Sequence, residues 1–134
     1  MRFTRKEKGW KFEVYLAKLP NEKCPARDYL DSLEKKVKAK LIIRINRMAE
    51  VGYISNTDHF KMLSEGLFEF KHTRPHHRIL GYFSKVVKKR IVLTHGYQKQ
   101  SNRTPRNELN RTKYIRDEYE KELKERLKKK EEEK

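Results

Sequence analysis

The stretch that decides the fold is residues 67–97, which read LFEFKHTRPHHRILGYFSKVVKKRIVLTHGY. It contains three runs rich in aliphatic and aromatic side chains, at 67–72, 78–83 and 90–97. The polar segments between them are short enough to be hairpin connections. The pattern therefore predicts three consecutive antiparallel strands.

Successive side chains point to opposite faces of a strand, and this assigns the last run to two faces. Alternation predicts one face made of Ile91, Leu93, His95 and Tyr97. Val92 and Thr94 fall on the other face.

The upstream residues predict one strand and two helices. Residues 10–16 alternate apolar and polar side chains, as expected for a strand. Pro25 is suited to begin a short helix that carries Tyr29, Leu30 and Leu33. A second helix is expected at 35–52, with a buried stripe of Val37, Leu41, Ile45 and Met48 and a stop at Gly52. Residues 53–66 are expected to form a loop.

The downstream residues predict one terminal helix. Thr104 is the expected cap and Pro105 the expected first helical residue. Acid-first pairs four residues apart, such as Asp117–Lys121, support the helix. Its end, about 120–134, is expected to be a solvated, fraying extension.

Together these elements predict a single α+β domain spanning residues 1–134. We expect a twisted, mainly antiparallel sheet with an N-terminal helical hairpin and a C-terminal helix, the helices covering one face.

The charge of the chain favours a polyanionic partner. It has 35 Lys+Arg against 19 Asp+Glu, a net charge of +16. The last 24 residues carry only +2 of this charge, whereas residues 71–111 carry 11 basic residues and one acid, Glu108. The charge therefore coincides with the predicted strands rather than with a tail.

Membrane and disulfide-rich classes are not expected. The longest aliphatic runs are too short to span a bilayer, no apolar stretch of signal-peptide length follows the N-terminus, and Cys24 is the single cysteine. We expect a cytoplasmic protein without a cofactor.

The basic strands carry the residue types of a metal-free ribonuclease. Such an enzyme must deprotonate the 2′-hydroxyl, protonate the 5′-oxygen and stabilise the charge that develops on the phosphate. The candidates are Lys71, His76, His77, Arg78, Tyr82, His95, Tyr97, Lys99 and Arg103. Only Glu69 and Glu108 are acidic nearby, which speaks against a metal-dependent nuclease.

Each candidate also has a purely structural interpretation. Arg78 could be solvated or salt-bridged, and His95 could be a buried, hydrogen-bonded histidine. Tyr82 and Tyr97 could be core or rim aromatics rather than base-stacking platforms. Lys88 and Lys89 could bind the RNA backbone or only keep a hairpin soluble.

The motifs of this stretch resemble the RelE/HigB superfamily of type II toxins, in particular its phage-derived HigB-like branch. They are LFEFK at 67–71, Arg78-Ile79-Leu80, the Leu-x-His-Gly-Tyr-x-Lys run at 93–99, Thr104-Pro105 and Glu108-Leu109. The resemblance implies a compact RelE-like fold and a metal-independent endoribonuclease, an mRNA interferase that cuts mRNA in the ribosomal A site. It also implies a cognate antitoxin as partner, expected to be of the helix-turn-helix type.

The resemblance also implies roles for individual residues. Arg78 matches the arginine that holds the scissile phosphate, assisted by Lys71 and Lys99, and Arg103 matches a further basic position. His95 and Tyr97 match positions near the active site, so that the general acid or base stays open between His95, His77 and Tyr97. His77, Tyr82, Lys88, Lys89 and Arg103 are expected to bind RNA.

Two other functions fit the same residues. One is a basic RNA-binding protein without catalysis, which predicts salt-sensitive binding to many RNAs. The other is a ParE-like toxin that poisons gyrase on the same fold, which the basic, histidine-bearing strands make the weaker alternative.

Overall fold

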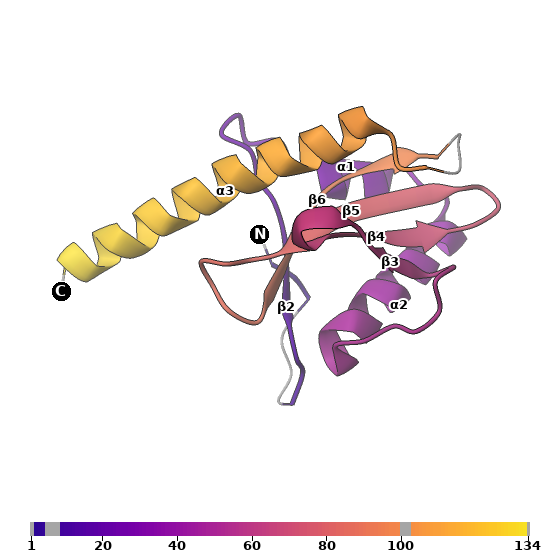
Figure 1. Ribbon diagram of the computed structural model, residues 1–134, viewed down its shortest axis with the longest axis horizontal. Coiled ribbons are helices and arrows are strands. Elements are labelled where there is room, and N and C mark those ends of the chain that lie inside the picture. Colours follow the sequence, from indigo (N-terminus) through magenta and orange to yellow (C-terminus); the bar gives the residue numbers. More distant parts are fainter. Residues whose placement is uncertain (1, 5–8, 100–102, 134) are drawn as a thin grey trace.

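The computed structural model describes residues 2–4, 9–99 and 103–133, with only the backbone described at 2–4. Within these residues the elements are β1 (Arg2–Thr4), β2 (Glu13–Leu16), α1 (Pro25–Asp31), α2 (Lys35–Val51), β3 (Phe60–Met62), the 3-10 turn η1 (Ser64–Gly66), β4 (Leu67–His72), β5 (His77–Phe83), β6 (Arg90–Gln98) and α3 (Arg106–Glu132). Their arrangement is shown in Figure 1. None of the described helices is both long and apolar enough to cross a membrane.

The described strands form one six-stranded sheet in the order β1-β2-β6-β5-β4-β3. Every neighbouring pair is antiparallel except β2 and β6, which run parallel. The three consecutive strands predicted from residues 67–97 are β4, β5 and β6, within one residue at each end. The predicted α+β class and mainly antiparallel sheet are thus confirmed.

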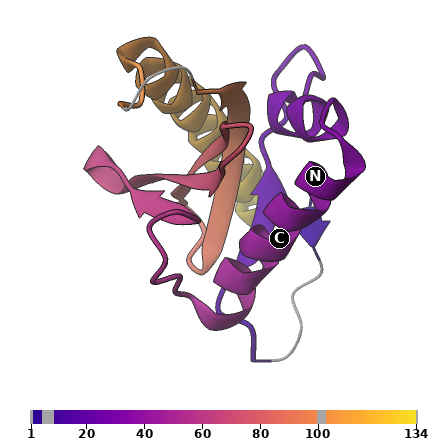
Figure 2. The ribbon, with the colours of Figure 1, turned by 90° about the vertical axis from the view of Figure 1, so that its right-hand side faces the viewer.

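The helices lie on both faces of the sheet rather than on one, as Figure 2 shows. The hairpin of α1 and α2 covers one face, and α3 crosses the other. The expectation of one covered face was wrong because β4, β5 and β6 are apolar on both sides. On the α3 side, Leu67, Tyr82 and Val92 form a second, smaller core with Ile115 of α3.

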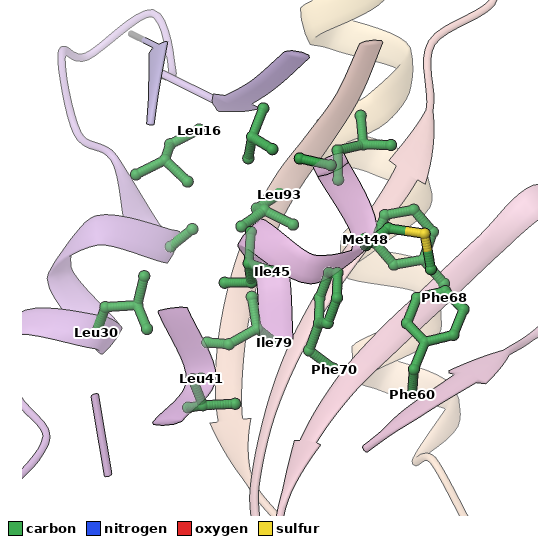
Figure 3. Close-up of a cluster of buried hydrophobic side chains, with 14 of the residues drawn as sticks. Leu16, Leu30, Leu41, Ile45, Met48, Phe60, Phe68, Phe70, Ile79 and Leu93 are labelled. Atoms are coloured by element: carbon green, nitrogen blue, oxygen red, sulfur yellow. The ribbon is translucent and has the colours of Figure 1, made fainter. Parts of the chain in front are cut away.

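The main core lies between the helical hairpin and the sheet (Figure 3). The predicted stripe of α2 is buried at Val37, Leu41, Ile45 and Met48. It packs against aromatic and aliphatic side chains of the sheet, including Phe60, Phe68, Phe70, Ile79 and Leu93. Burying each such side chain stabilises the fold by about 1.5–3 kcal/mol.

Three element boundaries differ from the predictions. The strand expected at 10–16 begins only at Glu13. Residues 60–62 form strand β3 inside the expected loop, because Phe60 pairs with Phe70 and packs on Phe68. Helix α3 begins at Arg106, one residue later than expected, and the Thr104 hydroxyl caps no backbone N–H but donates to Glu69, 3.0 Å away. The Thr104 hydroxyl therefore bonds to a distant side chain of the sheet instead of capping the helix.

A β-bulge at Thr94 changes the faces predicted for β6. Leu80 pairs with His95 but Gly81 pairs with Leu93, so Thr94 is the extra residue. Leu93 therefore faces α1 and α2, whereas Thr94 and His95 both contact α3. His95 was placed on the wrong face, because alternation alone carries no sign of a bulge.

The position of Gly96, the residue after His95, confirms the bulge at Thr94. A Cβ added at Gly96 would lie 2.4 Å from the ring of Tyr29 in α1 and 2.8 Å from Ile79. Gly96 therefore faces the helical hairpin, and glycine is required there so that α1 can approach β6. Its neighbours His95 and Tyr97 point to the α3 face.

Candidate active site

Three adjacent strands bring basic and phenolic side chains to one place on the α3 face of the sheet. Lys71 of β4 pairs with Arg78 of β5, which pairs with Tyr97 of β6. Lys99 follows β6, where its N–H donates to the carbonyl of His76 at 2.8 Å. We call Lys71, Arg78, Tyr97, Lys99 and the carboxylate Glu69 between them the Arg78 cluster.

Arg78 is buried, with 4% of its surface exposed. Its Nη1 donates to the carbonyl oxygens of His72 (3.1 Å) and His77 (2.9 Å). Its Nε lies 3.9 Å from Glu69 Oε1 and has no hydrogen-bond partner among the described residues. The guanidinium is therefore held by the hairpin backbone, and its buried Nε is a donor without a hydrogen-bond partner in this conformation.

Glu69 is the buried acid of the cluster and was not among the predicted site residues. Only 1% of its surface is exposed, and its Oε2 accepts hydrogen bonds from Tyr97 Oη (3.4 Å) and Thr104 Oγ1 (3.0 Å). Glu69 thus connects β4 with β6 and with the segment that precedes α3. Strand alternation contains the signal for it, since Glu69 and Lys71 share a face of β4.

Burial and crowding shift the pKa values of the titratable groups in the cluster. Burial raises the pKa of Tyr97 to about 12, and the negative charge of Glu69 adds to this effect. Burial also lowers the pKa of Lys71 and of Lys99, and the charge of Arg78 lowers both further, whereas Glu69 opposes the change. Tyr97 therefore keeps its proton at neutral pH, while the two lysines release theirs more readily than free lysine.

His95 lies beneath α3 and is fully buried. Its Nδ1 is 3.2 Å from Thr94 Oγ1 and its Nε2 is 3.1 Å from Glu108 Oε2. Burial lowers the pKa of His95 to about 4, helped by Arg111 and opposed by Glu108. Of its two interpretations, the buried, hydrogen-bonded histidine describes this geometry, and a substrate has no access to the ring.

His77 points away from the Arg78 cluster. Its Nδ1 forms a hydrogen bond with the hydroxyl of Tyr29 in α1, on the opposite face of the sheet. Burial lowers its pKa, and the nearby His72 and Arg78 act in the same direction. His77 therefore lies on the opposite face of the sheet from the side chain of Arg78, because neighbours along a strand point to opposite faces.

Tyr82, Lys88 and Lys89 are also separated from the cluster. Tyr82 is buried under α3, where its hydroxyl donates to Glu120 at 3.0 Å, so it has no free ring face on which a base could stack. Lys88 and Lys89 are exposed in the β5–β6 connection, at the far end of β5 from Arg78. Arg103 is exposed next to Thr104, and in the sequence it follows shortly after Lys99 of the cluster.

No group of three or more His, Cys, Asp or Glu side chains that could hold a metal ion is found in the described ranges. A cavity of about 680 Å³ lies between α3 and the β5–β6 connection, where Tyr82, Glu120 and Arg116 are among its lining residues. It is remote from Arg78, at the other end of β5.

The chain matches the model of a known protein family. The family model described as "Phage derived protein Gp49-like (DUF891)" matches residues 28–116, more than half of the chain.

The chain belongs to this Gp49-like family.

Gp49-like proteins are phage-derived and form a RelE/HigB-like toxin family of toxin–antitoxin systems. The match covers the whole Arg78 cluster together with Thr104 and Glu108, and ends within α3. A search of curated proteins finds no match. The phage-derived toxin character that the motifs imply is thus confirmed at the level of the Gp49-like family.

Proposed function

We propose that this Gp49-like protein is a toxin that acts as a metal-independent endoribonuclease, cleaving mRNA in the ribosomal A site. The observation that supports this most is the Arg78 cluster, in which one guanidinium, two lysines and a phenol converge on one face of the sheet. This is the set of groups that phosphodiester cleavage requires when no metal ion takes part.

In the proposed reaction, the 2′-oxygen attacks the phosphorus and the bond to the 5′-oxygen breaks, leaving a 2′,3′-cyclic phosphate. In this proposal the guanidinium of Arg78, whose buried Nε lacks a hydrogen-bond partner, moves to bind a phosphate oxygen, and the charge of one lysine stabilises the transition state. Tyr97, which keeps its proton, donates it to the departing 5′-oxygen. The other lysine of the pair Lys71 and Lys99 accepts the 2′-hydroxyl proton in this proposal, a role that the lowering of their pKa values favours.

His95 has a positioning role in this proposal. Its hydrogen bond to Glu108 attaches the first turn of α3 to β6. It thereby fixes the segment that contains Thr104, which contacts Glu69 in the Arg78 cluster.

Cleavage of mRNA on translating ribosomes, in the Mg²⁺ that ribosomes require, tests the proposal, and cleavage of free RNA by the purified protein in EDTA tests its metal independence. We expect Arg78→Ala to reduce cleavage by about 10²–10³-fold, as for the loss of one transition-state donor. Lys88→Ala, which removes an exposed charge at the far end of β5, should cleave at the wild-type rate. Full activity of Arg78→Ala on translating ribosomes, or cleavage of free RNA that occurs with Mg²⁺ and is abolished by EDTA, would contradict the mechanism.

The second candidate function is RNA binding without cleavage. It is favoured by the burial of Arg78 and His95, which in this conformation makes both of them part of the packing. It predicts binding to unrelated RNAs that weakens steeply with salt, and intact RNA after prolonged incubation. The cleavage assay above therefore separates the two functions.

A further inference from the structure

The outer surface of α2 carries a groove of about 350 Å³ that plays no part in the proposed chemistry. We call it the α2 groove; its lining residues are Lys40, Ile43, Arg44, Arg47, Ile54 and His59. The helical hairpin covers the face of the sheet opposite α3, so the groove opens on the side of the molecule away from the Arg78 cluster.

The apolar part of the α2 groove is aliphatic. Ile43 is 66% exposed on a helix whose other large apolar side chains mostly face the core. Ile54 beside it is half-buried and packs against the main core. An exposed isoleucine next to a half-buried one offers a place for the apolar side chain of a partner.

The rim of the groove is positive. Helix α2 contains six lysines and arginines and a single acid, Glu50. Lys38 pairs with Asp31, but no ion pair within the described part of the chain joins Lys40, Arg44 or Arg47 to a carboxylate. Three unpaired cations around an aliphatic centre complement an amphipathic segment with acidic residues.

We propose that the α2 groove binds an acidic, amphipathic helix of a protein partner, namely the antitoxin that the proposed toxin function requires. An aliphatic side chain of that helix packs between Ile43 and Ile54, and its carboxylates pair with Lys40, Arg44 and Arg47. The aliphatic pair Ile43 and Ile54 favours the apolar side chain of a protein. The arginine and histidine side chains of the groove are also of the types on which RNA bases stack, so that RNA binding is a separate outcome of the test below. The inference rests on the proposed function for the identity of the partner.

The α2 groove is physically linked to the Arg78 cluster through Lys71. Arg44 Nη1 donates a hydrogen bond to the carbonyl oxygen of Lys71. The N–H of Lys71 donates to the carbonyl of His59 at 2.9 Å. Two lining residues of the groove thus contact the backbone of a residue of the Arg78 cluster.

The test compares wild type, Ile43→Glu and Arg47→Glu as full-length proteins. Binding to the product of the neighbouring gene is measured by calorimetry, and neutralisation is measured as growth on co-expression. Lys128→Glu is the matched control for Arg47→Glu, because it makes the same two-unit charge change on the exposed end of α3. Circular dichroism and urea unfolding establish that the variants fold.

We expect each groove variant to bind the partner at least about tenfold more weakly while RNA cleavage stays at the wild-type rate. Lys128→Glu should bind as wild type does. Wild-type affinity of both groove variants, or the absence of any complex with the wild-type chain, would overturn the inference.

A groove that serves RNA instead would give the opposite result. Both variants would then keep the partner but lose affinity for a 12-nucleotide RNA, and this too would overturn the inference. If the proposed toxin function is wrong, the result differs both from loss of partner binding and from loss of RNA binding. In that case the wild type neither cleaves RNA nor arrests growth, while calorimetry still reports on the α2 groove.

Discussion

The central pair of the molecule, Arg78 and Glu69, is buried but not in direct contact. Their closest atoms are 3.9 Å apart, so the attraction between them compensates only part of the cost of removing both charges from water. Neutral donors and acceptors supply the rest, namely Thr104 and Tyr97 at the carboxylate and two backbone carbonyls at the guanidinium. The carboxylate of Glu69 thus does not occupy the Nε donor of Arg78, which is compatible with the phosphate contact proposed above.

Acid sensitivity is expected mainly at His95, whose pKa burial lowers strongly, and His77 adds to it in the same direction. In the unfolded chain the pKa of His95 is about 6.5, whereas burial lowers it to about 4 in the folded protein. Between these values the unfolded state binds more protons, so stability is lost as the pH falls. The contribution lost at pH 5 is about 2 kcal/mol. Urea unfolding at pH 7 and pH 5 measures it.

The matched variants for this prediction are His95→Asn and His76→Asn. His95→Asn cannot titrate and should lose less stability between pH 7 and pH 5 than the wild type. His76 is exposed in the β4–β5 connection, so His76→Asn should keep the wild-type difference. Equal pH dependence of all three proteins would show that His95 does not cause the loss.

The candidate residues could be predicted from the sequence to the extent that they follow strand alternation. Lys71 and Arg78 each lie on the face that their own strand pattern gives them, and pairing of the strands brings them together. Glu69 was seen as a nearby acid, but its contacts with Tyr97 and Thr104 depend on packing between distant segments. Such contacts leave no local pattern.

At the scale of elements, a single carboxylate joins α3 to the β5–β6 connection. Glu120 Oε2 accepts the Tyr82 hydroxyl at 3.0 Å. Its Oε1 accepts Ser84 Oγ at 2.6 Å and the N–H groups of Lys85 (3.1 Å) and Val86 (3.3 Å). Four donors thus depend on one side chain of a helix that is otherwise held mainly by apolar contacts.

Replacing Glu120 by alanine is expected to loosen that connection. Removing the carboxylate leaves the buried Tyr82 hydroxyl without its acceptor, and we expect a loss of about 2–3 kcal/mol in the free energy of unfolding. The amide hydrogens of Lys85 and Val86 should exchange faster with solvent. Urea unfolding and hydrogen exchange measure the two effects.

Glu122→Ala is the control for this prediction. Glu122 is two residues further along α3 and pairs only with Arg126 on the surface in the described part of the chain. Its loss should cost well under about 1 kcal/mol. Equal effects of the two substitutions would contradict the role of Glu120.

Elements with strong local patterns were predicted well, and those defined by distant partners were not. The hydrophobic stripe of α2 and the alternation of β4 and β5 each fix an element within its own residues. Strand β3 is three residues long and exists because Phe60 pairs with Phe70. The bulge at Thr94 is likewise decided by how β6 fits against β5.

At the scale of the whole molecule, the positive charge belongs to the folded body. From Lys124 onward every described side chain of α3 is exposed, and Figure 1 shows this part of the helix extending beyond the sheet. The segment 124–134 contains six basic and four acidic residues, so it carries only +2 of the net charge of +16. Neither the stability nor the affinity for a polyanion should depend on it.

A chain that ends at Leu123 tests this expectation. We expect its free energy of unfolding to stay within about 0.5 kcal/mol of the full-length value, since exposed residues contribute little. The dependence of RNA affinity on salt should keep its slope within about one unit, because few net charges are removed. Urea unfolding and binding titrations at several salt concentrations measure both.

A large change in either quantity would assign 124–134 a role in folding or in binding. The matched control is a full-length chain with Leu127→Ala, which changes the most apolar exposed position of the segment without removing charge. It should behave as the wild type does.

Because β2 pairs with β6, which is far along the chain, the sheet can be completed only late in protein synthesis. More than half of the chain is made between these two strands, so β2 has only β1 beside it until 90–93 leave the ribosome. At about 5–20 residues per second, that wait lasts several seconds. A chain that stops before β6 contains Arg78, but it lacks Tyr97 and the strand that joins β2 to β5. The cell that makes this toxin therefore meets the assembled Arg78 cluster only in nearly finished copies.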